Sequence, residues 1–164
     1  MNSHQRLLKL YDTHSERVFR FCLRLCMGNQ EDAEDLTQEV FLAALGSLSR
    51  FAGRATTQTW LFRIAVFKSR ELRLRRKNFL IVSVPQELPA PSTERQMLTK
   101  LSLERALECL TEAQREAFLL VKAEGFTSKE AAGILQAPQG TVQSRVHEAT
   151  VKLRAILTEE TQEV

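Results

Sequence analysis

Two groups of reactive side chains recur at helical spacing in this sequence. His14, Cys22 and Cys26 lie four or eight residues apart, so one helix face could present an imidazole and two thiolates to Zn²⁺. Their apolar neighbours favour the alternative, a buried and reduced pair of cysteines. Asp35 and Glu39 are spaced like paired catalytic carboxylates, but no nucleophile or metal ligand is evident near them. We therefore expect no enzymatic activity, no metal and no cofactor, and we interpret these carboxylates as part of a contact face.

Charge gathers in two adjacent patches of opposite sign. Residues 31–39 contain five carboxylates, whereas residues 50–77 contain nine basic residues and one acidic residue, a local charge of +8 in a chain of net charge +3. A strongly basic segment suits a phosphate backbone, and neighbouring patches of opposite sign suggest two different partners. The alternative is a pair of solvated helix faces without a partner.

The elements that carry these residues are expected to be helices. The 164 residues include only six glycines and four prolines, and Leu, Ala, Glu, Gln and Arg, which enter helices at little cost, dominate. Apolar residues at helical spacing predict three helices in the first half of the chain, over 5–27, 31–48 and 59–77. The fold class is therefore all-α.

Residues 78–93 are expected to link two domains. They contain three of the four prolines and show no helical period. The predicted domains are 1–77 and 94–164, and a hydrophobic content of 43% allows each a small core. With three cysteines, no secretory signal and no apolar run longer than six residues, we expect a protein of the reducing cytoplasm that is not inserted in a membrane.

The end of the chain has the layout of a helix-turn-helix. Thr127 and Glu130 fit a capping box that starts a short helix ending near Leu135. A brief turn leads to a longer helix that begins at Pro138 and runs to about Leu157. Its apolar positions form one narrow stripe: Val142, Val146, Ala149 and Leu153. The remaining surface carries donors for phosphates and base edges, so the helix is predicted to read DNA, the alternative being a plain helical hairpin.

Four motifs, in the right order and at the right spacing, resemble those of the extracytoplasmic-function (ECF, group IV) RNA polymerase sigma factors. DAEDLTQEVFLAAL (32–45) is similar to the polymerase-binding helix of that family, and TWLFRIA (59–65) to its promoter-melting helix. LTEAQREAFLL (110–120) with EGFT (124–127) resembles the opening of its −35-binding domain. GTVQSRVH (140–147) resembles its recognition helix. The resemblance covers nearly the whole chain except the linker.

The resemblance implies a sigma factor that binds core RNA polymerase, recognises −10 and −35 promoter elements and initiates transcription of a specific regulon. The first domain would dock on the β′ clamp helices through Asp35, Leu36, Glu39 and Val40. It would capture extruded bases of the −10 element with cationic and aromatic groups. These are Phe51, Arg54, Gln58, Trp60, Arg63, Arg73, Arg75 and Arg76. The second domain would read the −35 element through Thr141, Ser144, Arg145, His147, Glu148 and Lys152.

The implied partners are core RNA polymerase, through its β′ clamp helices and β flap, promoter DNA, and an anti-sigma factor that can hold this cytoplasmic bacterial protein at the membrane. Trp60 has a second interpretation as a core residue rather than a base-stacking one. Glu148 stands where the family usually has a basic residue. It could accept a hydrogen bond from a cytosine amino group, or it could face an anti-sigma factor or solvent; its place on the helical wheel favours the DNA surface. The family usually has glycine where Gln136 stands.

Two other functions fit the sequence. One is a stand-alone helix-turn-helix regulator whose first half is a sensor or dimerisation domain. The other is an interaction protein that mimics a sigma factor without initiating transcription. Run-off transcription with core polymerase separates all three.

Overall fold

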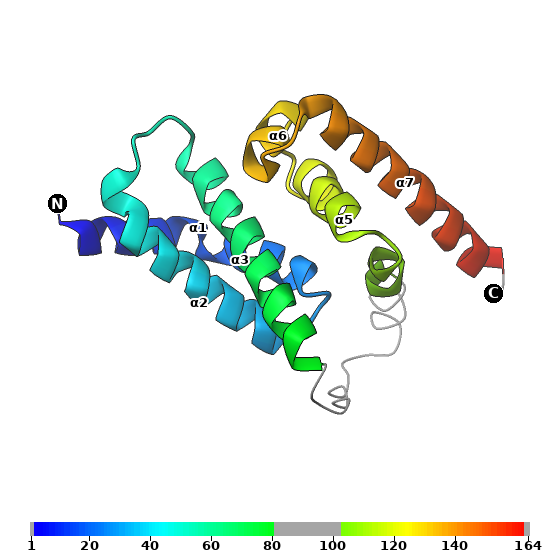
Figure 1. Ribbon diagram of the computed structural model, residues 1–164, viewed down its shortest axis with the longest axis horizontal. Helices are drawn as coiled ribbons and strands as arrows, with labels where there is room; N and C mark the ends of the chain where they lie inside the picture. Colours follow the sequence, from blue (N-terminus) through cyan, green and yellow to red (C-terminus); the bar gives the residue numbers. More distant parts are fainter. Residues whose placement is uncertain (1, 81–102, 163–164) are drawn as a thin grey trace.

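The computed structural model describes residues 2–80 and 103–162, and all regular structure in these ranges is helical, which confirms the predicted fold class (Figure 1). The first range contains α1 (Ser3–Leu25), α2 (Gln30–Ser47), the 3₁₀ turn η1 (Leu48–Arg50) and α3 (Thr57–Leu80). The second contains helical residues 103–108, α5 (Glu112–Phe118), the π-helical turn η2 (Leu119–Ala123), α6 (Ser128–Leu135) and α7 (Gln139–Gln162). Helix α3 continues through residues 78–80 of the predicted linker, and the rest of that linker lies outside the described residues.

Helices α1, α2 and α3 pack around one apolar core. α1 ends earlier than expected because Met27 and Gly28 both have positive φ angles, 51° and 84°, which the right-handed helix cannot contain. Asn29 then caps α2, since its side chain accepts a hydrogen bond from the backbone N–H of Asp32 at 3.1 Å. The largest fully buried side chains of this core are Val18, Phe21, Cys22, Leu36, Val40, Leu61, Phe62 and Val66.

Helices α6 and α7 form the helix-turn-helix, with α5 packed against α7. The predicted capping box is present, because Thr127 accepts from the N–H of Glu130 at 3.1 Å and Glu130 accepts from the N–H of Thr127 at 2.8 Å. Gln136 ends α6 in the left-handed conformation (φ 52°, ψ 47°), the position where the family usually has glycine. A side chain there costs about 1 kcal/mol relative to glycine. The predicted apolar stripe of α7 is buried: Val142, Val146, Ala149 and Leu153.

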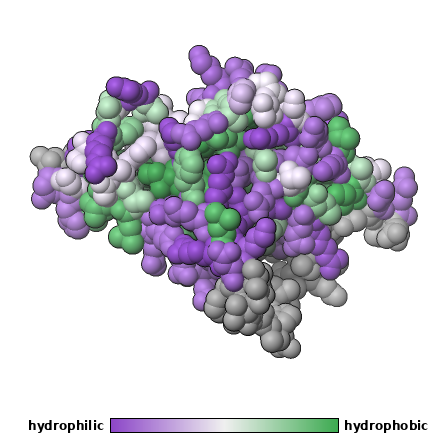
Figure 2. All heavy atoms as spheres, in the orientation of Figure 1, coloured by the Kyte–Doolittle hydropathy of each residue, from purple (hydrophilic) through white to green (hydrophobic). Residues whose placement is uncertain are grey.

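The two domains touch directly. α6 lies against α3, so the second domain covers one side of the first (Figure 1). At this contact the rings of Phe62 and Phe126 meet edge to face with centroids 5.1 Å apart. On the face shown in Figure 2 the surface is mostly hydrophilic, and the hydrophobic side chains form small separate patches.

Candidate nucleic-acid interface

An aromatic pair stands at the start of α3, beside the loop that joins it to α2. Phe51 and Trp60 stack with ring centroids 4.6 Å apart and an interplanar angle of 26°. Trp60 is half-buried and packs against the core, so part of its indole ring stays accessible. Arg54 and Arg63 are exposed nearby in sequence, and Gln58 is half-buried.

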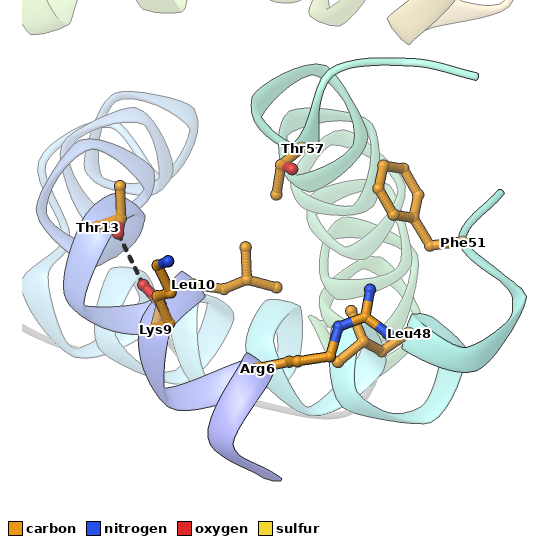
Figure 3. A pocket seen from close by; sticks show the side chains of 7 residues that line it. All are labelled: Arg6, Lys9, Leu10, Thr13, Leu48, Phe51 and Thr57. Carbon is orange, nitrogen blue, oxygen red and sulfur yellow. Dashed lines mark hydrogen bonds between the residues drawn. The ribbon is translucent and has the colours of Figure 1, made fainter. Parts of the chain in front are cut away.

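Each member of the aromatic pair lines a hollow that carries two cations. The first hollow lies between α1 and the segment from Leu48 to Thr57, and Figure 3 shows Arg6 and Lys9 beside it together with Phe51. The second is lined by Trp60, Arg63 and Lys68 and also by Ala43, Ile64 and Phe67. Apolar walls with cations at the edge can hold a base and its phosphate.

The three arginines predicted to join this site lie elsewhere. Arg73 is ten residues beyond Arg63 on the same helix, about 15 Å along its axis. It pairs with Glu116 at 2.6 Å, Arg75 pairs with Glu39 at 3.0 Å, and Arg76 pairs with Asp32. The predicted patch of +8 is therefore largely compensated at its carboxyl end by carboxylates from α2 and α5. The structure keeps exposed positive charge at the loop end, where Arg54 and Arg63 make no ion pair with any described residue.

The exposed face of α2 differs from the one predicted for docking. Leu36 and Val40 are 1% and 0% exposed, so they lie in the core and cannot contact a partner directly. Leu42 is 67% exposed, and it shares a surface stripe with other residues at helical spacing. The members of this stripe, which we call the α2 outer face, are Asp35, Gln38, Leu42 and Leu45. Glu39 lies at its edge and is bound to Arg75.

On the α1 face that carries His14, Cys22 and Cys26, both cysteines pack in or against the core. Cys22 is fully buried, and burial raises the pKa of its thiol to about 12. Burial raises the pKa of Cys26 to about 11, with a further contribution from the carboxylate of Asp32. Both thiols are thus protonated near neutral pH and weakly nucleophilic. No cluster of three or more metal ligands occurs within residues 2–80 and 103–162.

The residues of α7 that are predicted to contact DNA fall into two sets. Ser144 and His147 are exposed, and Thr141 and Arg145 are half-exposed near the amino end of the helix. Glu148 and Lys152 are also exposed, but their charged groups contact Gln114 of α5. Glu148 accepts a hydrogen bond from the Gln114 side-chain amide at 2.9 Å, and Lys152 donates to the Gln114 carbonyl oxygen at 3.1 Å.

Sequence reasoning missed two carboxylates of the second domain, Glu116 and Glu124. Their side chains are only 3% and 5% exposed. Glu116 lies between Ala113 and Leu120 on the apolar side of its helix, and a charge on an apolar stripe is a signal for a buried partner. Sequence reasoning also missed Leu42, because α2 is apolar over more than one face and its pattern does not separate Leu42 from the buried residues.

The fold thus defines an all-helical protein of two domains, the second a helix-turn-helix. Residues 10–79 match the family Sigma-70 region 2, and residues 100–153 match Sigma-70, region 4. EcfG, an ECF RNA polymerase sigma factor of Rhodopseudomonas palustris, is 36% identical over 134 residues, covering 79% of this chain and 74% of its own length. SigE of Mycolicibacterium smegmatis is 32% identical over 94% of this chain, which spans 63% of SigE. The chain belongs to the ECF RNA polymerase sigma factors.

Solved structures agree with this family. The sigma factor RpoE of Bartonella quintana, in complex with the anti-sigma factor NepR, superposes with a TM-score of 0.76 at 26% identity over 94% of this chain and 96% of its own. CnrH, in complex with the cytosolic domain of CnrY, has the same fold, with a TM-score of 0.74 at 23% identity over 95% of this chain and 90% of its own. Sigma factors bind RNA polymerase, direct transcription initiation and are not enzymes, so the predicted class is confirmed. The alternative of a stand-alone regulator does not fit a chain whose first half is region 2. None of the described helices is long and apolar enough to cross a membrane.

Proposed function

We propose that this sigma factor captures single-stranded −10 bases at the Phe51–Trp60 pair and reads the −35 element with the amino-terminal part of α7. The observation that carries the proposal is the stacked aromatic pair, in which each ring lines a hollow that also has cationic side chains in its wall. Base–aromatic stacking contributes about 1–3 kcal/mol per base, which offsets the few kcal/mol needed to unstack a base from the duplex. Arg54 and Arg63 then hold the strand through its phosphates.

Core RNA polymerase is proposed to dock on the α2 outer face. Leu42 and Leu45 give this face an apolar centre, and Asp35 adds negative charge at one end. Exposed apolar residues rimmed by polar ones are typical of protein-binding surfaces. The expected surface on the polymerase is the β′ clamp helices, with the second domain directed to the β flap. Leu36 and Val40 support the docking face from beneath, by packing α2 on the core.

An anti-sigma factor is proposed as a further partner that would hold the sigma factor inactive. The sigma factor would then be a protein of the bacterial cytoplasm that its anti-sigma factor can retain at the membrane. The support is the similarity to RpoE of Bartonella quintana, which was solved with its anti-sigma factor.

Run-off transcription with purified core polymerase on genomic fragments tests the proposed function. Promoter-specific transcripts are expected with the wild-type protein. Substitution of Trp60 by alanine should abolish opening of the promoter duplex but leave binding of the double-stranded −35 element in place. Polymerase binding without any transcript would instead identify a protein that mimics a sigma factor.

At the −35 element, Arg145 rather than Glu148 is expected to set base preference. Arg145 makes no ion pair with any described residue, whereas Glu148 is held by Gln114. Arg145→Ala should therefore relax the preference at one −35 position by about 1–3 kcal/mol. Glu148→Ala should leave the preference unchanged and lower the free energy of unfolding by about 0.5–1.5 kcal/mol, the contribution of one hydrogen bond.

Selection of −35 variants with both mutants measures this difference. A change of base preference in Glu148→Ala would show that the carboxylate leaves Gln114 and contacts DNA.

A further inference from the structure

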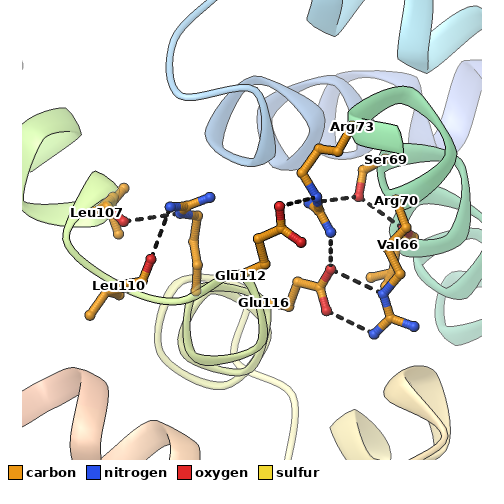
Figure 4. Close-up of polar contacts among 9 residues, drawn as sticks. Val66, Ser69, Arg70, Arg73, Leu107, Leu110, Glu112 and Glu116 are labelled. Carbon is orange, nitrogen blue, oxygen red and sulfur yellow. Dashed lines mark hydrogen bonds and ion pairs between the residues drawn. The ribbon is translucent and has the colours of Figure 1, made fainter. Parts of the chain in front are cut away.

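Two buried carboxylates of the second domain take all their ion-pair partners from the first. Glu116 of α5 lies between two arginines of α3: Arg70 donates to it at 2.8 and 3.2 Å, and Arg73 donates at 2.6 Å (Figure 4). Arg73 also pairs with Glu112 at 3.2 Å. The Glu116 carboxylate raises the pKa of Arg70, so this guanidinium stays charged. Within the described residues, Glu116 has no cationic partner from its own domain.

Glu124 repeats this arrangement with two arginines of α1. Arg17 and Arg24 of α1 both donate to its carboxylate at 3.0 Å, and Arg17 also donates to its backbone carbonyl at 2.6 Å. The Arg17 guanidinium also lies 5.4 Å and 5.7 Å from the ring centroids of Phe62 and Phe126, which meet across the same contact. The contact therefore combines an aromatic pair with two buried carboxylates, each of which is paired with two arginines.

This contact keeps the domains too close for the proposed promoter complex. Elements centred at −10 and −35 are about 25 base pairs apart, which is about 85 Å of B-form DNA at ~3.4 Å per base pair. In the structure α6 packs directly on α3, so one molecule in this form cannot place both domains on their elements. The same contact occupies Arg73, a residue predicted from the sequence to bind DNA.

We propose that Glu116 and Glu124, with Arg17, Arg24, Arg70 and Arg73, form an interdomain latch that holds the free sigma factor closed. The latch stabilises a closed form without any partner, and promoter binding requires its release. Release is feasible because both sides of each ion pair regain water, which offsets much of the attraction lost. Opening also frees Arg70 and Arg73 for phosphates.

The similarity to RpoE supports an intrinsic closed form. A TM-score of 0.76 over 94% of the chain requires both domains to superpose at once, so the arrangement seen here resembles that of RpoE bound to NepR. In this chain the arrangement is held by its own side chains. An anti-sigma factor would then select and stabilise a form that already exists, a step that rests on the proposed function.

Small-angle X-ray scattering of the full-length protein alone tests the latch. A compact chain of 164 residues has a radius of gyration of about 15 Å, and two separated domains exceed about 20 Å. Wild type is expected near the lower value, and Glu116→Gln with Glu124→Gln near the higher one. The matched control is Glu108→Gln with Glu159→Gln, which removes the same charge from exposed positions without ion pairs among the described residues. It should scatter like wild type.

A second variant removes the partners from the opposite side, Arg17→Gln with Arg70→Gln, and far-UV circular dichroism checks that each variant stays helical. Opening of both helical variants supports the latch, and either one suffices if the other loses helicity. An open wild type, or helical variants as compact as wild type, would overturn it. The opened variant should also bind DNA carrying both elements at least about fivefold more tightly, because less of the population is closed. Opening without tighter DNA binding would leave the latch established and count against the proposed promoter contacts instead.

Discussion

Leu42→Asp is expected to weaken binding of core RNA polymerase about 10- to 100-fold while leaving the free energy of unfolding unchanged. Leu42 is 67% exposed at the centre of the α2 outer face, so its side chain contributes little to the folded monomer. In a complex that buries it, the lost apolar contact is worth about 1.5–3 kcal/mol, and an unpaired carboxylate in its place adds a further penalty. Equilibrium titration of labelled protein with core polymerase measures the effect.

Leu74→Asp is the matched control, because Leu74 is similarly exposed (62%) but belongs to α3 and not to the α2 outer face. It should change polymerase affinity less than about twofold, in line with other surface substitutions. Equal weakening by the two substitutions would mean that general negative charge, not the α2 outer face, controls docking.

Leu36→Ala is expected to lower the free energy of unfolding by about 2–5 kcal/mol, the largest effect on stability that we predict. Leu36 is 1% exposed in the core formed by α1, α2 and α3, and its truncation leaves a cavity. Denaturant unfolding followed by circular dichroism measures the change. Any loss of polymerase binding should track the unfolded fraction.

Leu42→Ala provides the comparison on the same helix, with an expected change within about 0.5 kcal/mol. A stable Leu36→Ala protein that had lost polymerase affinity would return Leu36 to the docking face and contradict the packing described here.

Together the two predictions separate stability from docking along one helix. The motif that resembles the polymerase-binding helix contains both kinds of leucine, and sequence similarity cannot distinguish them. Burial assigns Leu36 to the core and Leu42 to the surface.

The features that local sequence specified were those that depend on neighbours within about one helical turn. The capping box of Thr127 and Glu130 involves residues three apart, and the apolar stripe of α7 repeats every three or four residues. Helix positions in the first domain were predicted to within two or three residues for the same reason. The family could be identified from the sequence because the four motifs occur in the family's order and at its spacing.

Long-range packing decided which of those helix faces became a site. α2 is apolar over more than one face, so only its contacts with α1 and α3 show that Leu36 and Val40 are buried and Leu42 is not. The pairs that neutralise Arg73, Arg75 and Arg76 join residues 43, 36 and 44 positions apart. No periodicity within a helix encodes such a pairing. The sequence shows where an arginine stands, but the helix that packs beside it determines which carboxylate neutralises its charge.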